Sequence, residues 1–321
     1  MERLQDYFRA LADLLFPRAC LVCGSRLGIH ERHLCLSCAA DVPYTHFWRQ
    51  SHNPMADRFN AVLERHRGTE RMAYAYAAAL MYYKGPYRSI PRALKYHGDL
   101  SAGQFYGALL GRRLASAPHF ADVDLVIPVP LHWSRRWSRG YNQAEVLARA
   151  LAEALSSTGR SSPPSVGGLV AAGRAAGLVS AHDTGLLSGP GTVCRTDLLV
   201  RARRTRTQTR LSVEEKARNV ASAFRVPERS GTMDRLRRWA IRVIGNMLHI
   251  PRDPFDWESP CTVLSSARHI VLVDDTFTTG ATLYACYAAL RPYTSARISI
   301  ATLAVVEGTP SGIEGSPSTG P

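Results

Sequence analysis

Short apolar runs bounded by polar turn residues dominate the hydrophobic pattern of the chain. Residues 270–273 are isoleucine, valine or leucine throughout, and residues 124–129 carry a similar run that stops at Pro130. Such continuous apolar runs are typical of strands buried on both faces of a parallel sheet. Helical periodicity follows over residues 283–290 and 142–155. The pattern therefore predicts an α/β fold with a mainly parallel sheet flanked by helices.

The rest of the chain divides around this pattern. An apolar stretch over residues 73–83 leads into a Gly-Pro turn, and helical character follows over residues 89–96 and 104–115. We expect residues 1–50 to form a short amphipathic helix and a small separate module. Residues 70–306 are expected to form the α/β domain, and a polar connector joins the two parts.

Two segments interrupt the α/β pattern, and we expect both to be flexible insertions. Residues 156–191 are rich in Gly, Ala, Ser and Pro, and residues 228–267 form the second insertion. Within the second insertion, residues 233–250 place arginines and apolar residues on different helical faces, which predicts a basic amphipathic helix. This helix could meet a membrane, a partner, DNA or its own domain. Residues 307–321 are rich in Gly, Pro and Ser, and we expect a disordered tail.

Two adjacent carboxylates and a hydroxyl-rich turn follow the first apolar run. Asp274 and Asp275 come at the expected carboxyl end of the strand, where ligands of open α/β sheets bind. Carboxylates suit vicinal ribose hydroxyls or a Mg²⁺ ion attached to the ligand. The turn before the next helix, whose first N–H groups attract phosphate, contains Thr278, Thr279, Gly280 and Thr282. The motif predicts a site for ribose with a 5′-phosphate; the alternative is an ordinary strand-to-helix turn with surface acids.

A group of arginines follows the second apolar run. Arg135, Arg136 and Arg139 lie close together in the sequence, and guanidinium groups suit bidentate contact with phosphate oxygens. We expect them to face the same crevice as the two acids. Trp133 and Trp137 in the same segment could stack on bases, although aromatic residues at this spacing are more often packing groups.

Charge and composition narrow the class of protein. The 321 residues carry a formal net charge of +14, with a pI near 9.8. Such charge attracts polyanions, whether nucleic acid, an anionic membrane surface or a phosphorylated substrate. Part of it lies in residues 203–212, a polar segment placed to close over a bound ligand. No apolar run approaches the ~20 residues that span a bilayer, and the N-terminus differs from a signal peptide. We therefore expect a cytoplasmic protein without a transmembrane segment.

Two C-x₂-C pairs near the N-terminus predict a metal site. Their residues are Cys20, Cys23, Cys35 and Cys38. This spacing lets four thiolates converge on one Zn²⁺, and a closed four-sulfur shell makes the ion structural. Disulfides and a redox pair are the alternatives, but thiols stay reduced in the cytosol. His30 and His33 in the connector could replace a cysteine ligand, although we expect both to be surface residues.

The order of these features resembles the ComF family, whose members are phosphoribosyltransferase-like proteins associated with natural competence. The resemblance covers most of residues 14–306 outside the two insertions. The two-acid motif itself resembles the phosphoribosyl pyrophosphate (PRPP) motif of type I phosphoribosyltransferases. Besides that motif and the cysteines, the segments that carry the resemblance are Tyr83-Lys84-Gly85-Pro86, Leu94-Lys95-Tyr96, Pro128-Val129-Pro130-Leu131-His132, Arg139-Gly140-Tyr141-Asn142-Gln143, and Gln208 with Arg218-Asn219.

The resemblance implies a type I phosphoribosyltransferase-like fold beside the zinc module. By the same resemblance Asp274 and Asp275 would hold the ribose of PRPP with its Mg²⁺, and the threonine turn would hold the 5′-phosphate. Arg135, Arg136 and Arg139 would contact the pyrophosphate. The expected catalytic residues are therefore the two acids and Arg139.

Two functions follow from the resemblance. The first is a PRPP-binding protein that assists DNA uptake by handling single-stranded DNA in the cytoplasm, beside the uptake machinery of the inner membrane. The second is an active phosphoribosyltransferase of nucleotide metabolism, whose acceptor the sequence does not identify. A transcriptional regulator with a phosphoribosyltransferase domain as its sensor is less favoured, because no helix-turn-helix is evident.

Overall fold

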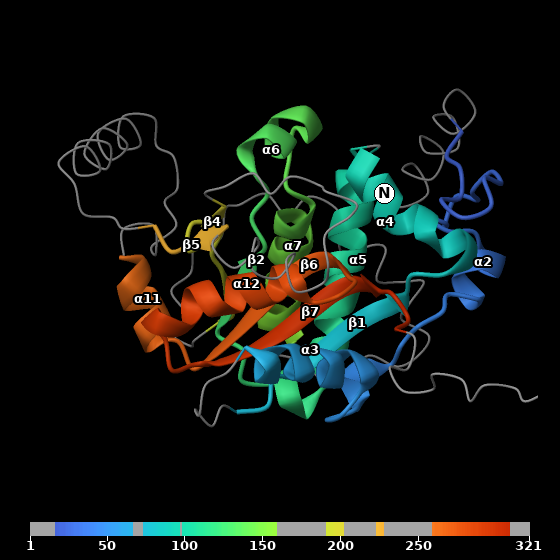
Figure 1. The fold of residues 1–321 in the computed structure, drawn as a ribbon. Helices are drawn as coiled ribbons and strands as arrows, with labels where there is room; N and C mark the ends of the chain where they lie inside the picture. The colour runs from blue at the N-terminus through green and yellow to red at the C-terminus, as the bar shows by residue number, and fades with distance from the viewer. Residues whose placement is uncertain are drawn as a thin grey trace, which may run out of the picture.

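The computed structural model describes residues 17–66, 73–96, 98–158, 191–201, 223–227 and 259–308. Within these residues one sheet has the strand order β1-β7-β6-β2-β3, and its neighbouring strands all run parallel (Figure 1). The strands are β1 (Ala77–Tyr82), β2 (Leu125–Pro128), β3 (Val193–Cys194), β6 (His269–Phe277) and β7 (Arg297–Val305). The expected α/β architecture with a parallel sheet is confirmed.

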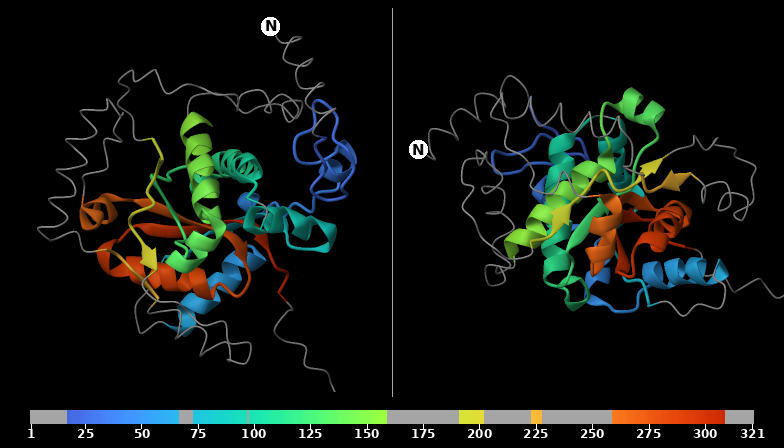
Figure 2. Two further views of the ribbon diagram at one scale, coloured as in Figure 1. Left: turned by 90° about the horizontal axis from the view of Figure 1, so that it is seen from above. Right: turned by 90° about the vertical axis from the view of Figure 1, so that its left-hand side faces the viewer.

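Helices cover both faces of this sheet (Figures 1 and 2). One face carries α4 (Ser89–Tyr96), α5 (Leu100–Ala115) and α7 (Gln143–Thr158). The other face carries α3 (Pro54–Arg65), α11 (Pro260–Ser266) and α12 (Ala281–Leu290). The remaining described elements are α2 (Leu36–Ala40), α6 (Trp133–Arg139), the antiparallel pair β4 (Val200–Arg201) and β5 (Phe224–Arg225), and the short 3-10 helices η1 (Phe47–Arg49), η2 (Gly85–Arg88), η3 (Pro118–Phe120) and η4 (Arg291–Tyr293).

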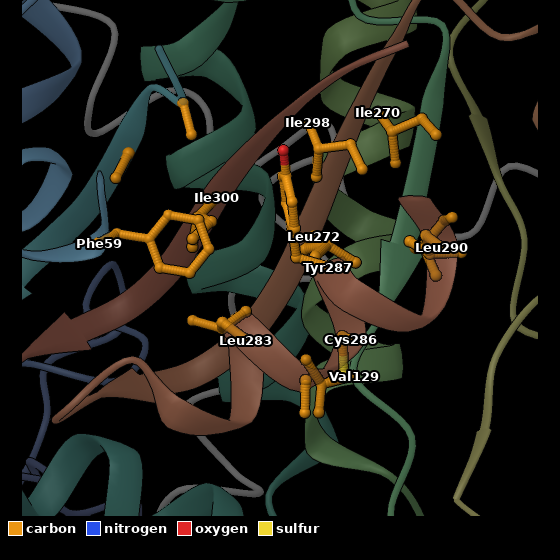
Figure 3. Close-up of a cluster of buried hydrophobic side chains, with 14 of the residues drawn as sticks. Phe59, Val129, Ile270, Leu272, Leu283, Cys286, Tyr287, Leu290, Ile298 and Ile300 are labelled. Atoms are coloured by element: carbon orange, nitrogen blue, oxygen red, sulfur yellow. The ribbon is translucent and has the colours of Figure 1, made fainter. Parts of the chain in front are cut away.

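Strand β6 divides the hydrophobic core into two layers, because successive side chains of a strand face opposite sides. Leu272 packs with Phe59 of α3 and Leu283 of α12 on one face (Figure 3). Val273 packs in the cluster that contains Leu147 of α7 on the other face. All five side chains are buried. The continuous apolar run is therefore explained by burial on both faces.

A stripe of glycines lets α5 pack closely against α7. A Cβ atom at Gly107 would lie 2.6 Å from the carbonyl oxygen of Leu147, and one at Gly111 would lie 2.6 Å from that of Leu151. At Gly103 the nearest atom is instead Val146 Cγ1, at 2.8 Å. The helix backbones approach each other at positions where side chains are missing.

Strand β6 is longer than the sequence pattern indicates. The apolar run predicts an end at Val273, but the strand continues to Phe277 because β7 runs beside it over the same length. Asp274 lies opposite Thr302, and Phe277 lies opposite Val305. The acidic pair is therefore part of the strand.

Helix α3 is absent from the sequence-based prediction, which has a polar connector at residues 51–69. Asn53 caps this helix, since its Oδ1 accepts a hydrogen bond from the backbone N–H of Met55 at 3.1 Å. Met55, Phe59 and Leu63 are buried in the main core. The connector prediction is wrong because these apolar residues recur at helical spacing among polar ones.

The predicted insertions are only partly described. The described end of the second one, residues 228–267, is helix α11, whose Leu264 is fully buried in the main core. The first one, residues 156–191, begins within α7. Outside the described residues lie the expected N-terminal helix before residue 17, the bulk of both insertions, the closing segment 203–212, the basic helix 233–250 and the tail from residue 309.

The N-terminal module lies beside α4 and α5, where Figure 2 shows it in blue. The Tyr87 hydroxyl donates to the carbonyl oxygen of Cys38 at 3.0 Å. Near the end of the module, Tyr44 forms an antiparallel bridge with Met81 of β1. None of the described helices has the length and apolar character that a membrane span requires.

Candidate functional site

The strand order creates a crevice between the carboxyl ends of β2 and β6. The chain leaves β2 through α7 toward β3 on one side, and it leaves β6 through α12 toward β7 on the other. Such a reversal is where open α/β sheets bind ligands. A cavity of about 720 Å³ lies there, and its lining includes Lys95, Tyr96, Leu131, Arg139, Tyr141, Gln143, Arg201, Asp274, Asp275 and Thr282.

The two acids line this cavity together. The backbone N–H of Asp275 donates to Asp274 Oδ1 at 2.8 Å, and Lys95 Nζ of α4 lies 2.6 Å from Asp275 Oδ2. Burial and the adjacent Asp275 carboxylate raise the pKa of Asp274 well above its usual range. Two neighbouring carboxylates suit a hard divalent cation or sugar hydroxyls, so this donor set fits the Mg²⁺ that the sequence motif implies.

Only part of the threonine turn, residues 278–282, lies at the cavity. Thr282, in the first turn of α12, lines the cavity, whereas Thr278 and Thr279 are exposed and do not appear in its lining. Gly280 has a φ of 79°, and a Cβ there would lie 3.1 Å from the Phe277 ring. An L-residue is therefore strained at this turn, which accounts for the glycine.

Arg58 supports this turn from α3. Its guanidinium donates to the carbonyl oxygen of Thr278 and, at 2.7 Å, to that of Val306. Sequence reasoning missed Arg58, because its partners are 220 and 248 residues away. No local pattern marks such a contact.

Of the three arginines expected at the crevice, Arg139 lines the cavity. Its Nη1 donates to Gln143 Oε1 at 3.1 Å, and its guanidinium lies 5.7 Å from the Tyr96 ring centroid. Arg136 is 64% exposed and lies 3.8 Å from Glu145, outside the cavity lining. Arg135 belongs to α6, but its side chain is outside the described part of the structure.

Trp137 of α6 is 85% exposed, so the packing interpretation of this side chain is wrong. The expected burial fails because α6 projects beyond the sheet (Figure 1). The side chain of Trp133 lies outside the described residues.

Three cavity residues received no role from the sequence. Lys95 and Gln143 entered only as parts of family segments, and Arg201 lies just before the polar segment 203–212. Gln143 is 2% exposed, and its Nε2 has no hydrogen-bond partner among the described residues. An unpaired buried N–H group favours a ligand oxygen at this wall of the cavity.

The four N-terminal cysteines converge in space. Their sulfur atoms all lie within 4.8 Å of one another, and Cys23 Sγ is 3.7 Å from Cys35 Sγ. A tetrahedron with Zn–S bonds of about 2.3 Å has edges of about 3.8 Å, so the geometry fits zinc. None of the described cysteines forms a disulfide. The predicted four-cysteine zinc-binding site is confirmed.

Local hydrogen bonds build the two cysteine turns. Gly24, with a φ of 74°, donates its N–H to the Cys20 carbonyl oxygen at 2.9 Å. A hydrogen bond from Ser25 lowers the pKa of the Cys23 thiol to about 6, whereas burial and the neighbouring thiols raise the pKa of Cys38. His33 is no ligand, but it is not a surface residue as expected, because its ring packs 5.1 Å from that of Phe105.

Comparison with known proteins supports the N-terminal assignment. The family model of the double zinc ribbon domain matches residues 11–48, which contain all four cysteines. No curated protein matches the chain. The match does not extend into the α/β domain, so the N-terminal part of the chain is similar to a double zinc ribbon domain and carries a zinc-binding site.

Proposed function

We propose that the α/β domain is of the type I phosphoribosyltransferase kind and binds PRPP with Mg²⁺ in the cavity between β2 and β6. One observation carries the proposal: Asp274, Asp275 and Thr282 of the PRPP-like motif share this cavity with Arg139, which comes from the end of helix α6. Its volume of about 720 Å³ is within the usual range of small-molecule sites, about 300–1,000 Å³.

The lining residues match the parts of this ligand by chemistry. The carboxylates of Asp274 and Asp275 suit the hydroxyl groups of the ribose. A Mg²⁺ ion held by the same carboxylates would neutralise part of the phosphate charge. Thr282 and the start of α12 suit the 5′-phosphate. The guanidinium of Arg139 suits the pyrophosphate group.

Calorimetric titration of the zinc-loaded protein with Mg²⁺-PRPP tests this proposal. We expect saturable binding by the wild type and a loss of at least about tenfold in affinity for the double variant Asp274→Asn, Asp275→Asn, since the loss of charged partners removes about 1.5–3 kcal/mol per hydrogen bond. The matched control is Glu64→Gln with Glu153→Gln, which removes two exposed carboxylates and should leave affinity unchanged. Absence of wild-type binding would reject the proposal.

For the cellular role we propose the ComF type, in which the protein handles single-stranded DNA during uptake. The supporting observation is Trp137, which is 85% exposed on α6 and follows the exposed Arg136 in the sequence. An exposed aromatic ring suits base stacking, and an exposed guanidinium on the same helix suits phosphate contact. In a mobility assay, Trp137→Ala should retain less oligonucleotide than the wild type, and binding should weaken steeply with salt. Equal retention by the variant would remove Trp137 from this role.

Catalytic phosphoribosyl transfer is the alternative use of the same cavity. Lys95 and Arg139 both line the cavity, and cations there would stabilise a departing pyrophosphate. Pyrophosphate release from PRPP, measured with candidate acceptors, separates the two uses. Release by the wild type and not by the double aspartate variant supports transfer, and equal release by both rejects it.

A further inference from the structure

We infer that Lys95 blocks Asp275 against free divalent cations, so that a metal ion enters the cavity only with an anionic ligand. The inference rests on the proposed PRPP site and adds an order of binding to it. Lys95 thus lowers the affinity of Asp274 and Asp275 for a divalent cation that arrives without an anionic ligand.

The contact between the two side chains is close and sheltered. Lys95 Nζ lies 2.6 Å from Asp275 Oδ2, and the side chains are 26% and 13% exposed. An ion pair held at this distance and partly removed from water is screened less than a surface pair. A cation that binds Asp275 through Oδ2 must therefore displace the Lys95 ammonium group.

Helix α4 holds Lys95 in this position. Ile90 and Leu94 of the same helix are buried in the core, and the Tyr141 hydroxyl donates to the carbonyl oxygen of Leu94. The lysine is thus presented from a packed element. Its ammonium group faces the acids without the need to order a loop first.

The net charge of the cavity lining also opposes the binding of a free divalent cation. Its described lining carries three cations, Lys95, Arg139 and Arg201, and two carboxylates, Asp274 and Asp275. The sum is positive even with both acids ionised. Such a cavity repels a free dication and attracts a polyanion.

A ligand with phosphate groups changes this balance. Its oxygens offer Lys95 another partner, and the Asp275 carboxylate then becomes available to a metal ion or to sugar hydroxyls. Metal and anion should therefore bind with positive coupling, each raising the affinity for the other.

Binding of Mn²⁺ alone tests the inference, measured by the electron paramagnetic resonance signal of free Mn²⁺ with zinc-loaded full-length protein. We expect Lys95→Met to bind Mn²⁺ about tenfold more tightly than the wild type, and Asp275→Asn added to Lys95→Met to abolish the gain. Lys95→Arg keeps the charge and should behave as the wild type. Lys84→Met is the matched control, because Lys84 pairs with Glu307 at 3.5 Å on the surface.

Equal Mn²⁺ uptake by the wild type and by Lys95→Met overturns the inference, provided that circular dichroism shows both to be folded. Lys95→Gln serves the same purpose if the methionine variant does not fold. The result is distinguishable from a failure of the proposed function, which is absence of Mg²⁺-PRPP binding by the wild type. Gain of Mn²⁺ affinity on loss of Lys95 supports the inference whether or not PRPP is the anion.

Discussion

The guanidinium of Arg58 in α3 donates to the main-chain oxygen of Thr278, in the turn that follows β6. A second N–H of the same group reaches Val306 beyond the end of β7, and the guanidinium lies 5.2 Å from the Phe277 ring centroid. One side chain therefore joins the turn of the proposed phosphate site to the neighbouring strand.

Loss of this side chain should weaken both stability and ligand binding. In Arg58→Met, two carbonyl oxygens lose their donor, and we expect the free energy of unfolding to fall by about 1–3 kcal/mol. Urea titration measures this change, and calorimetry with PRPP measures the loss of affinity. Arg65→Met, an exposed change at the end of the same helix, is the control. Identical unfolding curves for the two variants would contradict the bracing role.

The contact between α5 and α7 should be sensitive to one methyl group. Gly107→Ala places a Cβ 2.6 Å from the carbonyl oxygen of Leu147, and backbone cannot move aside as a side chain can. We expect a loss of about 1–3 kcal/mol in unfolding free energy. Gly103→Ala meets side chains and no backbone, with Val146 Cγ1 nearest at 2.8 Å and Leu94 Cδ2 at 3.6 Å, and should destabilise less. Thermal unfolding of the two variants measures the difference, and Gly107→Ala should have the lower midpoint. A lower midpoint for Gly103→Ala would show that α5 and α7 are not held at this distance.

Acid should destabilise the sheet through His269. Its ring is buried, with Nδ1 2.7 Å from Asp122 and Nε2 2.8 Å from Ser299. Burial lowers the pKa of His269 although Asp122 opposes the shift, so the unfolded chain binds the proton more tightly. Stability is therefore full above the unfolded pKa of about 6.5 and falls as pH decreases from there toward the lowered pKa of the folded state.

Unfolding in urea at pH 5 and pH 7.5 tests whether the protein is less stable at the lower pH. His269→Gln removes the titrating ring, and its smaller loss of stability between the two pH values would identify the group. His30→Gln, an exposed histidine, should retain the full wild-type dependence. A wild type that is more stable at pH 5 would refute the assignment.

Removal of one zinc ligand should unfold the N-terminal module selectively. Cys20→Ser takes away the most buried of the four thiols, at 3% exposure, and metal binding supplies folding energy in modules this small. We expect loss of zinc by elemental analysis and rapid proteolysis before residue 50. Cys261→Ser, an exposed thiol elsewhere, should keep its zinc. Full zinc content in both variants would mean that other ligands suffice.

The features that the sequence predicts well are those whose signal is local. The run before Asp274 is apolar at every position, so strand β6 and the following helix are evident without any partner. The spacing of the two C-x₂-C pairs by itself predicts that four sulfur atoms can surround one zinc ion. Both predictions depend on residues within one short segment.

The parts of the cavity that escaped prediction come from distant segments. Lys95 meets Asp275 only because α4 and β6 are brought together by the sheet. A sequence motif also does not show which of its side chains face the cavity. In this motif Thr282 lines the cavity, whereas Thr278 and Thr279 are exposed. Helix α3 is a different case, because Met55, Phe59 and Leu63 recur at helical spacing and so provide a local signal that the polar-connector prediction overlooked.

The position of β7 has a consequence for how the polypeptide acquires its shape. Within the described sheet, β1 pairs with β7 and with no other strand, so residues 77–82 await residues 297–305 during synthesis. Until then their earlier partner is the segment around Tyr44, whose bridge to Met81 covers the opposite edge of β1. That bridge protects only one edge of β1, so we expect the edge that faces β7 to stay unpaired until the last strand has been synthesised.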